Sequence, residues 1–372
     1  MKREVIVIGV THHNTLSMVR CIGQEYGNVE LLLYASGKKS YISKSKNVNK
    51  AIFVESVMEC FYYLMKRPLG EQKAILISCT DQIAQLLDQH QAELIPKYEF
   101  FQCKQGGDLT RYMNKQMQVD LASSVGLNTP VSYEYKKGCN LKYIGNYPCV
   151  VKPVESYIGG KKIVICMDES EVRQTVDNEQ IDWQIQELVN KKTEIVLTGV
   201  SINSEIIIPG YVQKHREING GTTYSTIRPF DKSMDKLVEC SKKMIRAIDY
   251  EGLFGFEFIF DGNDYWFLEL NLRNDATCYT YKVAGVNLPL IYLKGKEGES
   301  LLPFVCGIVQ VDSMVEPNDF SFVISRKVSL AKWIKQLSHS KCKYLYDSGD
   351  LKPLLYYIAY TFQRKIIHKK EK

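Results

Sequence analysis

The sequence predicts an α/β domain at the N-terminus followed by a larger α+β region. In the first hundred residues, short unbroken apolar runs alternate with helical stretches, which is typical of a parallel sheet covered on both faces. Near Asp108 this alternation stops, and a strong β-hairpin pattern follows at 254–273. A chain of 372 residues is also too long for one ordinary core, so we expect two or three packed domains.

Composition excludes several classes of protein. Apolar residues make up 45% of the chain and charged residues 24%, which excludes a disordered or fibrous protein. The net charge of +6 is too small by itself to indicate nucleic-acid binding, and binding of a small anionic ligand would explain it equally well. Eleven cysteines without a C-x-x-C pair, no 18-residue apolar run and no signal-peptide pattern predict a cytoplasmic protein with reduced cysteines.

The first 105 residues are predicted to form a parallel sheet. Strands are expected over 4–10, 29–34, 51–54 and 74–77, with helices over 14–21, 56–65 and 81–91. Ligands of such sheets bind beyond the carboxyl ends of the strands, where this chain carries His12, His13, Thr80 and Asp81. Two interpretations stay open for each pair. His12 and His13 either bind substrate or face solvent, and Thr80 and Asp81 either bind a ligand or cap a helix. The dinucleotide fingerprint G-x-G-x-x-G is absent.

The middle of the chain contains lysines and glycines that suit a phosphate site. A helix is predicted over 110–125, with Lys115 near its start. In the next strand Lys152 is the only charge, and a bound phosphate would supply the partner that a buried ammonium requires. Gly159 and Gly160 follow in a loop whose backbone N–H groups could approach an anion, although a plain hairpin turn explains the loop equally well.

Two further segments are weaker signals. A short strand over 183–189 ends in polar residues and is followed by Glu194. A strand predicted over 205–212 runs on to Lys214, and a glycine- and hydroxyl-rich segment then leads to Arg228. Glycines and hydroxyl groups of this kind can line an anion site.

The strongest local pattern is a β-hairpin, with strands at 254–260 and 265–273 joined by an Asp-Gly-Asn-Asp turn. Strand alternation predicts one face with Trp266, Leu268, Leu270 and Leu272, and another with Tyr265, Phe267, Glu269, Asn271 and Arg273. Glu257 interrupts an otherwise apolar strand, which a simple solvated face does not explain. We therefore expect Glu257, Glu269 and Asn271 to converge on a hard cation such as Mg²⁺.

Taken in order, these segments resemble the ATP-grasp superfamily. The matching pieces are Lys115 before a Gly-x-x-x-Pro turn, Val151-Lys152-Pro153, the glycine loop, Gln186-Glu187-Leu188-Val189, Glu257, and Glu269-Leu270-Asn271-Leu272-Arg273. The resemblance spans about residues 106 to 295. It implies an ATP-grasp fold over 106–300, with a lid at about 130–190. A Rossmann-like parallel-sheet domain over 1–105 would precede it, and a C-terminal extension over 301–372 with a basic helix would follow.

The resemblance also implies roles for individual residues. Lys115 and Lys152 would hold phosphates beneath a lid at Gly159 and Gly160. The adenine would lie along Gln186, Glu187, Leu188 and Val189, the ribose at Glu194, and the terminal phosphate near Lys214. Glu257, Glu269 and Asn271 would bind two Mg²⁺ ions, with Mn²⁺ as an alternative. Arg273 would face the reacting carboxyl-phosphate, a task for which Arg228 is a second candidate.

The implied activity is ATP-dependent joining of a small carboxylate to an amine through an acylphosphate. Trp333 and the run 350–354 resemble the end of ligases related to D-aspartate ligase and to capsule-polysaccharide enzymes, which suggests cell-wall or surface-polysaccharide synthesis. A catalytically silent ATP-binding regulator or scaffold is the alternative. The basic, apolar tail 354–372 either docks on its own domain or touches an anionic membrane surface, and a homodimer is expected as the commonest assembly.

Overall fold

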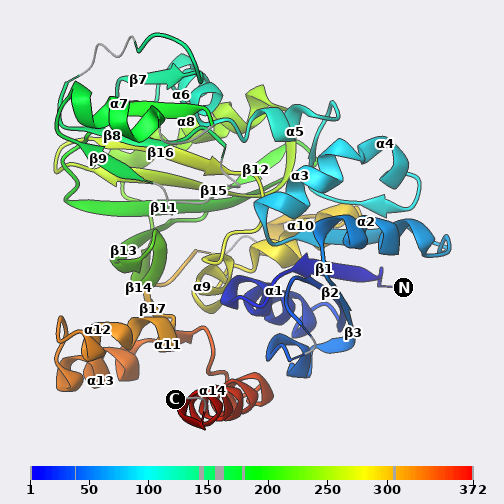
Figure 1. Cartoon of the computed structure of the whole chain (residues 1–372). Coiled ribbons are helices and arrows are strands. Elements are labelled where there is room, and N and C mark those ends of the chain that lie inside the picture. The colour runs from blue at the N-terminus through cyan, green and yellow to red at the C-terminus, as the bar shows by residue number, and fades with distance from the viewer. Residues whose placement is uncertain are drawn as a thin grey trace.

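The computed structural model describes residues 2–37, 39–141, 146–155, 163–177, 181–304 and 307–370 (Figure 1). Three sheets organise these residues, with five, four and nine strands. In Figure 1 the N-terminal sheet lies beside the large sheet, the small sheet caps one end, and the C-terminal helices lie at the opposite end. This mixed α/β architecture, with a parallel sheet at the N-terminus, confirms the predicted fold class.

The N-terminal sheet has the strand order β3-β2-β1-β4-β5, and all its neighbours are parallel. Its strands are β1 (Val5–Gly9), β2 (Val29–Tyr34), β3 (Val48–Val54), β4 (Ala74–Ser78) and β5 (Tyr98–Glu99). The helices around it are α1 (His13–Gly23), α2 (Val57–Lys66), α3 (Asp81–Gln89) and α4 (Gln91–Leu94), with a 3-10 turn η1 (Ile42–Lys44). Val5 and Val7 pack in a different apolar cluster from Ile6 and Ile8, so both faces of β1 are covered.

The small sheet is antiparallel, with the order β7-β10-β8-β9. Its strands are β7 (Ser132–Tyr135), β8 (Cys149–Pro153), β9 (Val164–Cys166) and β10 (Trp183–Glu187), and α7 (Glu169–Asp177) packs beside β9. The single helix predicted over 110–125 is wrong, because the chain forms α5 (Asp108–Arg111) and α6 (Lys115–Ser124). Asn114 separates them by accepting the backbone N–H of Met117 at 3.0 Å, which caps the second helix.

The large sheet has the order β16-β15-β11-β13-β14-β17-β18, with β12 and β6 paired at its sides. Its strands are β6 (Gln102–Cys103), β11 (Thr193–Ile202), β12 (Glu205–Ile207), β13 (Tyr211–Ile218), β14 (Gly221–Arg228), β15 (Tyr250–Phe260), β16 (Tyr265–Asn271), β17 (Val311–Met314) and β18 (Cys342–Lys343). The predicted strand over 205–212 is two strands, because Pro209 lacks a backbone N–H. Gly210 follows it in a position where a Cβ would lie 2.5 Å from the Arg228 carbonyl oxygen.

A β-bulge in the hairpin corrects the predicted faces of β16. Glu257 pairs with Glu269 but Phe258 pairs with Phe267, so Leu268 is the extra residue. The alternation therefore reverses there, and Phe267 is buried in the core while Leu268 lines a cavity. The predicted assignment of side chains to the two faces of β16 is correct after Leu268 and wrong before it.

The remaining helices are η4 (Lys232–Met234), α8 (Asp235–Ala247), α9 (Cys278–Val283), α10 (Leu288–Lys296), η5 (Leu302–Phe304), α11 (Glu316–Asp319), α12 (Ser321–Ile324), α13 (Leu330–His339) and α14 (Lys352–Lys370). A buried ion pair ties the start of the last segment to α1, since Arg20 Nε donates to Asp350 Oδ2 at 3.0 Å. Trp333 Nε1 donates to Asp319 Oδ2 at 3.0 Å. Within the described residues, no helix combines the length and apolar character needed to cross a membrane.

Candidate active site

Two adjoining cavities lie where the three sheets meet. The hairpin cavity, of about 540 Å³, is bounded by β8, β10 and the β15–β16 hairpin. The histidine cavity, of about 420 Å³, is bounded by the start of α1, the β13–β14 hairpin and the loop after β16. Residues common to both walls are Asp81, Asn219, Gly220, Glu257 and Arg273. Groups bound in the two cavities would therefore meet at these side chains.

The acidic residues predicted to bind metal lie together in the hairpin cavity. Glu257 on β15 stands opposite Glu269 on β16, and Asn271 Nδ2 lies 3.4 Å from Glu257 Oε1. Burial raises the pKa of Glu257, and the neighbouring Lys214 ammonium opposes that rise. In the described part of the chain no three His, Cys, Asp or Glu side chains gather as a complete metal site. Two carboxylates and an amide suit Mg²⁺ that also binds phosphate oxygens, because this ion rarely occupies an all-protein cage.

Two lysines face these acidic groups from the other side of the same cavity. Lys152 on β8 is only 4% exposed, and its Nζ donates to Gln186 Oε1 at 3.1 Å. Burial lowers the pKa of Lys152 to about 8, although the Glu269 carboxylate opposes this shift. Lys115, the first residue of α6, lies 3.5 Å from Glu269 Oε1. The arrangement gives the cavity a cationic wall and an anionic wall, as a metal-bound polyphosphate requires.

The predicted adenine residues line the hairpin cavity on β10 and just after it, at Gln186, Glu187, Leu188 and Val189. The side chain of Gln186 is already engaged, because it also donates to Ser132 Oγ at 2.8 Å. The apolar walls of this region, which sequence reasoning missed, are Val150, Ile163, Ile165, Ile259, Trp266 and Leu268. A planar base could pack between such walls. Gly159 and Gly160, predicted as the lid, lie outside the described residues.

Lys214 bridges two carboxylates near the meeting point of the cavities. Its Nζ bonds to Glu194 and donates to Glu257 Oε2 at 2.8 Å. Burial alone would lower the pKa of Lys214, but the carboxylates of Glu257 and Glu194 raise it. Glu194 lines the hairpin cavity and also receives Lys191 at 3.3 Å, so its carboxylate already has cationic partners.

Arg273 is held rigidly at the boundary of the two cavities. Its Nε donates to Asp81 Oδ1 at 2.6 Å, and its Nη2 donates to Asn271 Oδ1 at 3.0 Å. Burial would lower the pKa of this guanidinium, but the Asp81 carboxylate raises it. Thr80 accepts the Ile83 N–H at 3.3 Å, which confirms the capping interpretation for Thr80. Sequence reasoning missed that Asp81 positions an arginine 192 residues away.

Arg228 is not brought to the site. It lies at the last position of β14, opposite Tyr211, and it is absent from the described lining of both cavities. β14 follows the histidine cavity from Gly221 to Ser225, and Arg228 lies three residues beyond the last residue that lines it. Thr222, Thr223 and Ser225 of the same strand line the histidine cavity instead.

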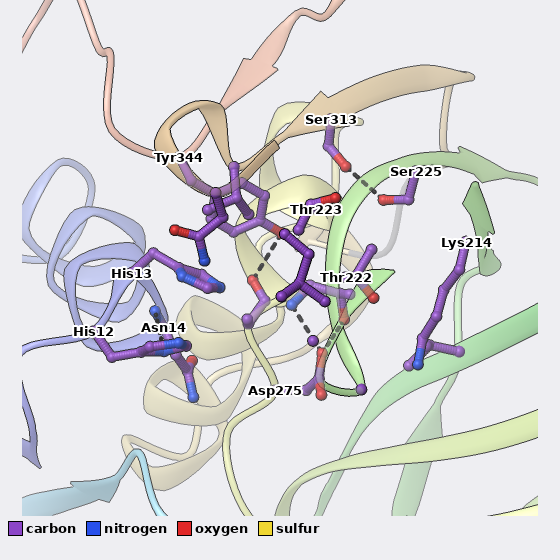
Figure 2. Close-up of a pocket in the computed structure, with 18 of the residues that line it drawn as sticks. His12, His13, Asn14, Lys214, Thr222, Thr223, Ser225, Asp275, Ser313 and Tyr344 are labelled. Atoms are coloured by element: carbon purple, nitrogen blue, oxygen red, sulfur yellow. Dashed lines mark hydrogen bonds between the residues drawn. The ribbon is translucent and has the colours of Figure 1, made fainter. Parts of the chain in front are cut away.

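Figure 2 shows the histidine cavity with His12 and His13 on one side and Lys214 on the other. The two imidazole rings lie 3.8 Å apart between centroids. Burial lowers the pKa of His12, and it lowers the pKa of His13 further with help from His12. Both rings are therefore neutral near pH 7, and they form a wall of the cavity, which is compatible with the interpretation as substrate ligands.

Known proteins resemble this chain in sequence and in structure. No family model matches the chain. It is 28% identical over 185 residues to the carbamoyl phosphate synthase large chain of Clostridium acetobutylicum, covering 45% of this chain but only 16% of that protein. The structure resembles N5-carboxyaminoimidazole synthetase from Staphylococcus aureus, at 14% identity, a TM-score of 0.66, and coverage of 88% and 86%. It also resembles L-amino acid ligase from Bacillus licheniformis, at 13% identity, a TM-score of 0.64, and coverage of 85% and 80%.

These proteins share one architecture, and the present structure reproduces it over most of its length. The chain spans less than a third of the length of the carbamoyl phosphate synthase large chain of Clostridium acetobutylicum and of the C-terminal section of its Aquifex aeolicus counterpart. The chain has the ATP-grasp fold, and the similar sequences and structures named above belong to the ATP-grasp superfamily.

Proposed function

We propose that this protein is an ATP- and Mg²⁺-dependent ligase that joins a small carboxylate to an amine through an acylphosphate. The observation that carries the proposal is the pairing of Glu257 with Glu269 across one hairpin, opposite Lys115 and Lys152. Had the two carboxylates pointed to opposite sides of the sheet, no polyphosphate site could have formed. Relatives and structural neighbours named as synthases and ligases support the same class of reaction.

The hairpin cavity would hold ATP. Its apolar walls suit the base, and its lysines suit the phosphates. Glu257, Glu269 and Asn271 would hold one or two Mg²⁺ ions, with Mn²⁺ as a substitute, and the metal would neutralise charge on the phosphates. Lys152 and Lys115 would orient the transferring phosphoryl group, since catalysis of this transfer depends on positioning and electrostatics.

Chemistry would occur at Arg273, where the cavities meet. A substrate carboxylate oxygen attacks the γ-phosphorus, the bond to the bridging oxygen breaks, and ADP leaves. The amine nitrogen then bonds to the acyl carbon, the C–O bond to phosphate breaks with its electron pair, and the nitrogen loses a proton. Arg273 would stabilise the negative charge on the acylphosphate, because Asp81 and Asn271 fix its guanidinium at that point.

Release of ADP tests this function. Amino acids and small dicarboxylates would be paired with amines, and ADP formation would be compared between wild type and Glu269→Ala. We expect a carboxylate-dependent rate in wild type that falls by roughly a hundredfold or more in the variant. Equal rates would refute the metal assignment. Tight ATP binding without turnover under every condition would instead favour the silent regulator or scaffold.

Other expectations remain proposals. A role in cell-wall or surface-polysaccharide synthesis, a homodimer and contact of the C-terminal helix with anionic lipid rest on sequence resemblance and composition. Leu351, Leu355 and Ile358 are exposed at the start of α14, which favours the lipid proposal. Pelleting with anionic vesicles, compared between the full chain and a chain ending at Asp350, which lacks these three residues but keeps the Arg20 partner, tests it. Identical pelleting of the two would remove it.

A further inference from the structure

On the described wall of the histidine cavity, carboxylates and cationic side chains are unequal in number. Its two cations, Lys214 and Arg273, are both bonded to carboxylates, through Glu257 and Glu194 in one case and Asp81 in the other. The cavity also contains a third carboxylate of its own, Asp275. Within the described residues Asp275 makes no ion pair, and Arg273, which feels its charge, is already bonded to Asp81, so the described wall has one more carboxylate than it has cations.

The Asp275 carboxylate is fixed in position. Its Oδ1 accepts the backbone N–H of Thr277 at 2.8 Å and the hydroxyl of the same residue at 2.5 Å. Among the described residues, no donor reaches Oδ2, and this atom is not among the buried side-chain oxygens without a partner. Figure 2 shows Asp275 between the histidine pair and Lys214 in this view of the cavity. One oxygen is therefore committed to the loop, and the other is available to a ligand.

The rest of the cavity wall does not neutralise this charge. Burial lowers the pKa of both His12 and His13, so neither imidazole supplies a cation near pH 7. The hydroxyls of Ser225 and Ser313 bond to each other at 2.7 Å, and the hydroxyl of Thr223 donates to Asp319 at 2.8 Å. A phosphorylated or dicarboxylate ligand would meet Asp275 with no uncommitted cation among the described residues to offset it.

We infer that the histidine cavity takes the amine acceptor in its ammonium form, with Asp275 as the carboxylate that binds the charged nitrogen. This rests on the proposed function and adds the acceptor class to it, namely an amine without a phosphate group. Because Arg273 borders both cavities, a nitrogen held at Asp275 lies on the acceptor side of the acylphosphate. The bound ammonium passes one proton to the Asp275 carboxylate, and the neutral nitrogen then has the lone pair that attacks the acyl carbon. The neutral, polar remainder of the wall suits a hydroxyl-bearing or amide-bearing acceptor.

A titration without nucleotide tests the inference separately from the reaction. The probe is ethanolammonium chloride, inorganic phosphate is the anionic comparison, and the readout is the NMR signals of the His12 and His13 rings, assigned with His→Gln variants. Wild type and the matched control Asp264→Asn, an exposed carboxylate in the hairpin turn, should show the same titration. Asp275→Asn should need roughly tenfold to hundredfold more ethanolammonium, because a charge-assisted hydrogen bond is lost.

Several outcomes would overturn the inference. They are equal titration of Asp275→Asn and wild type, no response of wild type to ethanolammonium, and phosphate shifting these signals at lower concentration than the amine. Asp275→Glu keeps the charge and should retain binding, which separates loss of the carboxylate from misfolding. If ADP release succeeds while this titration fails, the ligase proposal survives and the acceptor assignment falls. If the titration succeeds and ADP release fails, the cavity binds ammonium but the ligase proposal falls.

Discussion

The two cavities differ in how their charges are balanced. In the hairpin cavity, Lys152 on the small sheet and Lys115 on α6 face the acidic groups of the large sheet, and Lys115 and Glu269 already approach each other across it. Among the described residues of the histidine cavity, the carboxylates outnumber the cations by one, and the extra one is Asp275. A cavity whose charges pair across an open space suits a ligand that brings both a polyanion and a metal. A cavity with one charge left over suits a ligand with a single opposite charge.

The largest expected effect comes from the hairpin cavity. Glu257→Gln removes a carboxylate from the anionic wall while leaving the side chain its size. We expect ADP formation to fall roughly a hundredfold to a thousandfold, because a group that stabilises transition-state charge is lost. The measurement is steady-state turnover. Glu239→Gln, an exposed glutamate that pairs with Arg246, is the control and should match wild type. A rate for Glu257→Gln within tenfold of wild type would mean that the two walls do not bracket the phosphates.

A smaller effect is expected where the cavities meet. Asp81→Asn weakens the hold on Arg273 but leaves the hydrogen bond that Arg273 donates to Asn271 in place. The turnover number should fall roughly tenfold to a hundredfold, as expected for a misplaced positioning contact, while the affinity for ATP stays unchanged. If Asp81 served only the first turn of α3, the variant would lose about 0.3–1 kcal/mol of stability and keep its turnover. Thermal melting measured alongside turnover separates the two cases.

The smallest effect concerns pH. Burial lowers the pKa of Lys152 to about 8, so its ammonium is present below that pH and is lost above it. ATP affinity should therefore weaken as pH rises from 7 to 9, by at most about tenfold if only the charged form binds. Calorimetric titration at several pH values measures this change. Lys152→Arg stays charged throughout and should show a flat profile, whereas a slope of the same size in that variant would assign the effect to another group.

Much of the fold could be predicted because local sequence determines it. The N-terminal strands are continuous apolar runs, and a strand buried on both faces needs nothing else. The hairpin was predictable from the Asp-Gly turn residues. Glu257 and Lys152 drew attention because each is a charge within an apolar strand, and the structure places both in one cavity.

What sequence reasoning missed depends on long-range geometry. The bulge at Leu268 arises from the register between two strands, so strand alternation alone misassigned Phe267 and its neighbours. The contact between Asp81 and Arg273 joins the start of α3 to the segment just after β16, and no local pattern contains it. Arg228 was misplaced for a related reason, because it lies three extended residues beyond Ser225, the last residue of β14 that lines the cavity.

Capture of the acylphosphate tests the central claim most directly. Wild-type protein would be incubated with ATP, Mg²⁺ and a pool of amino acids and dicarboxylates, with hydroxylamine replacing the acceptor. The account predicts a hydroxamate formed in proportion to ADP, and almost none in Glu257→Gln. ADP formed without hydroxamate, or the same yield from both proteins, would contradict it.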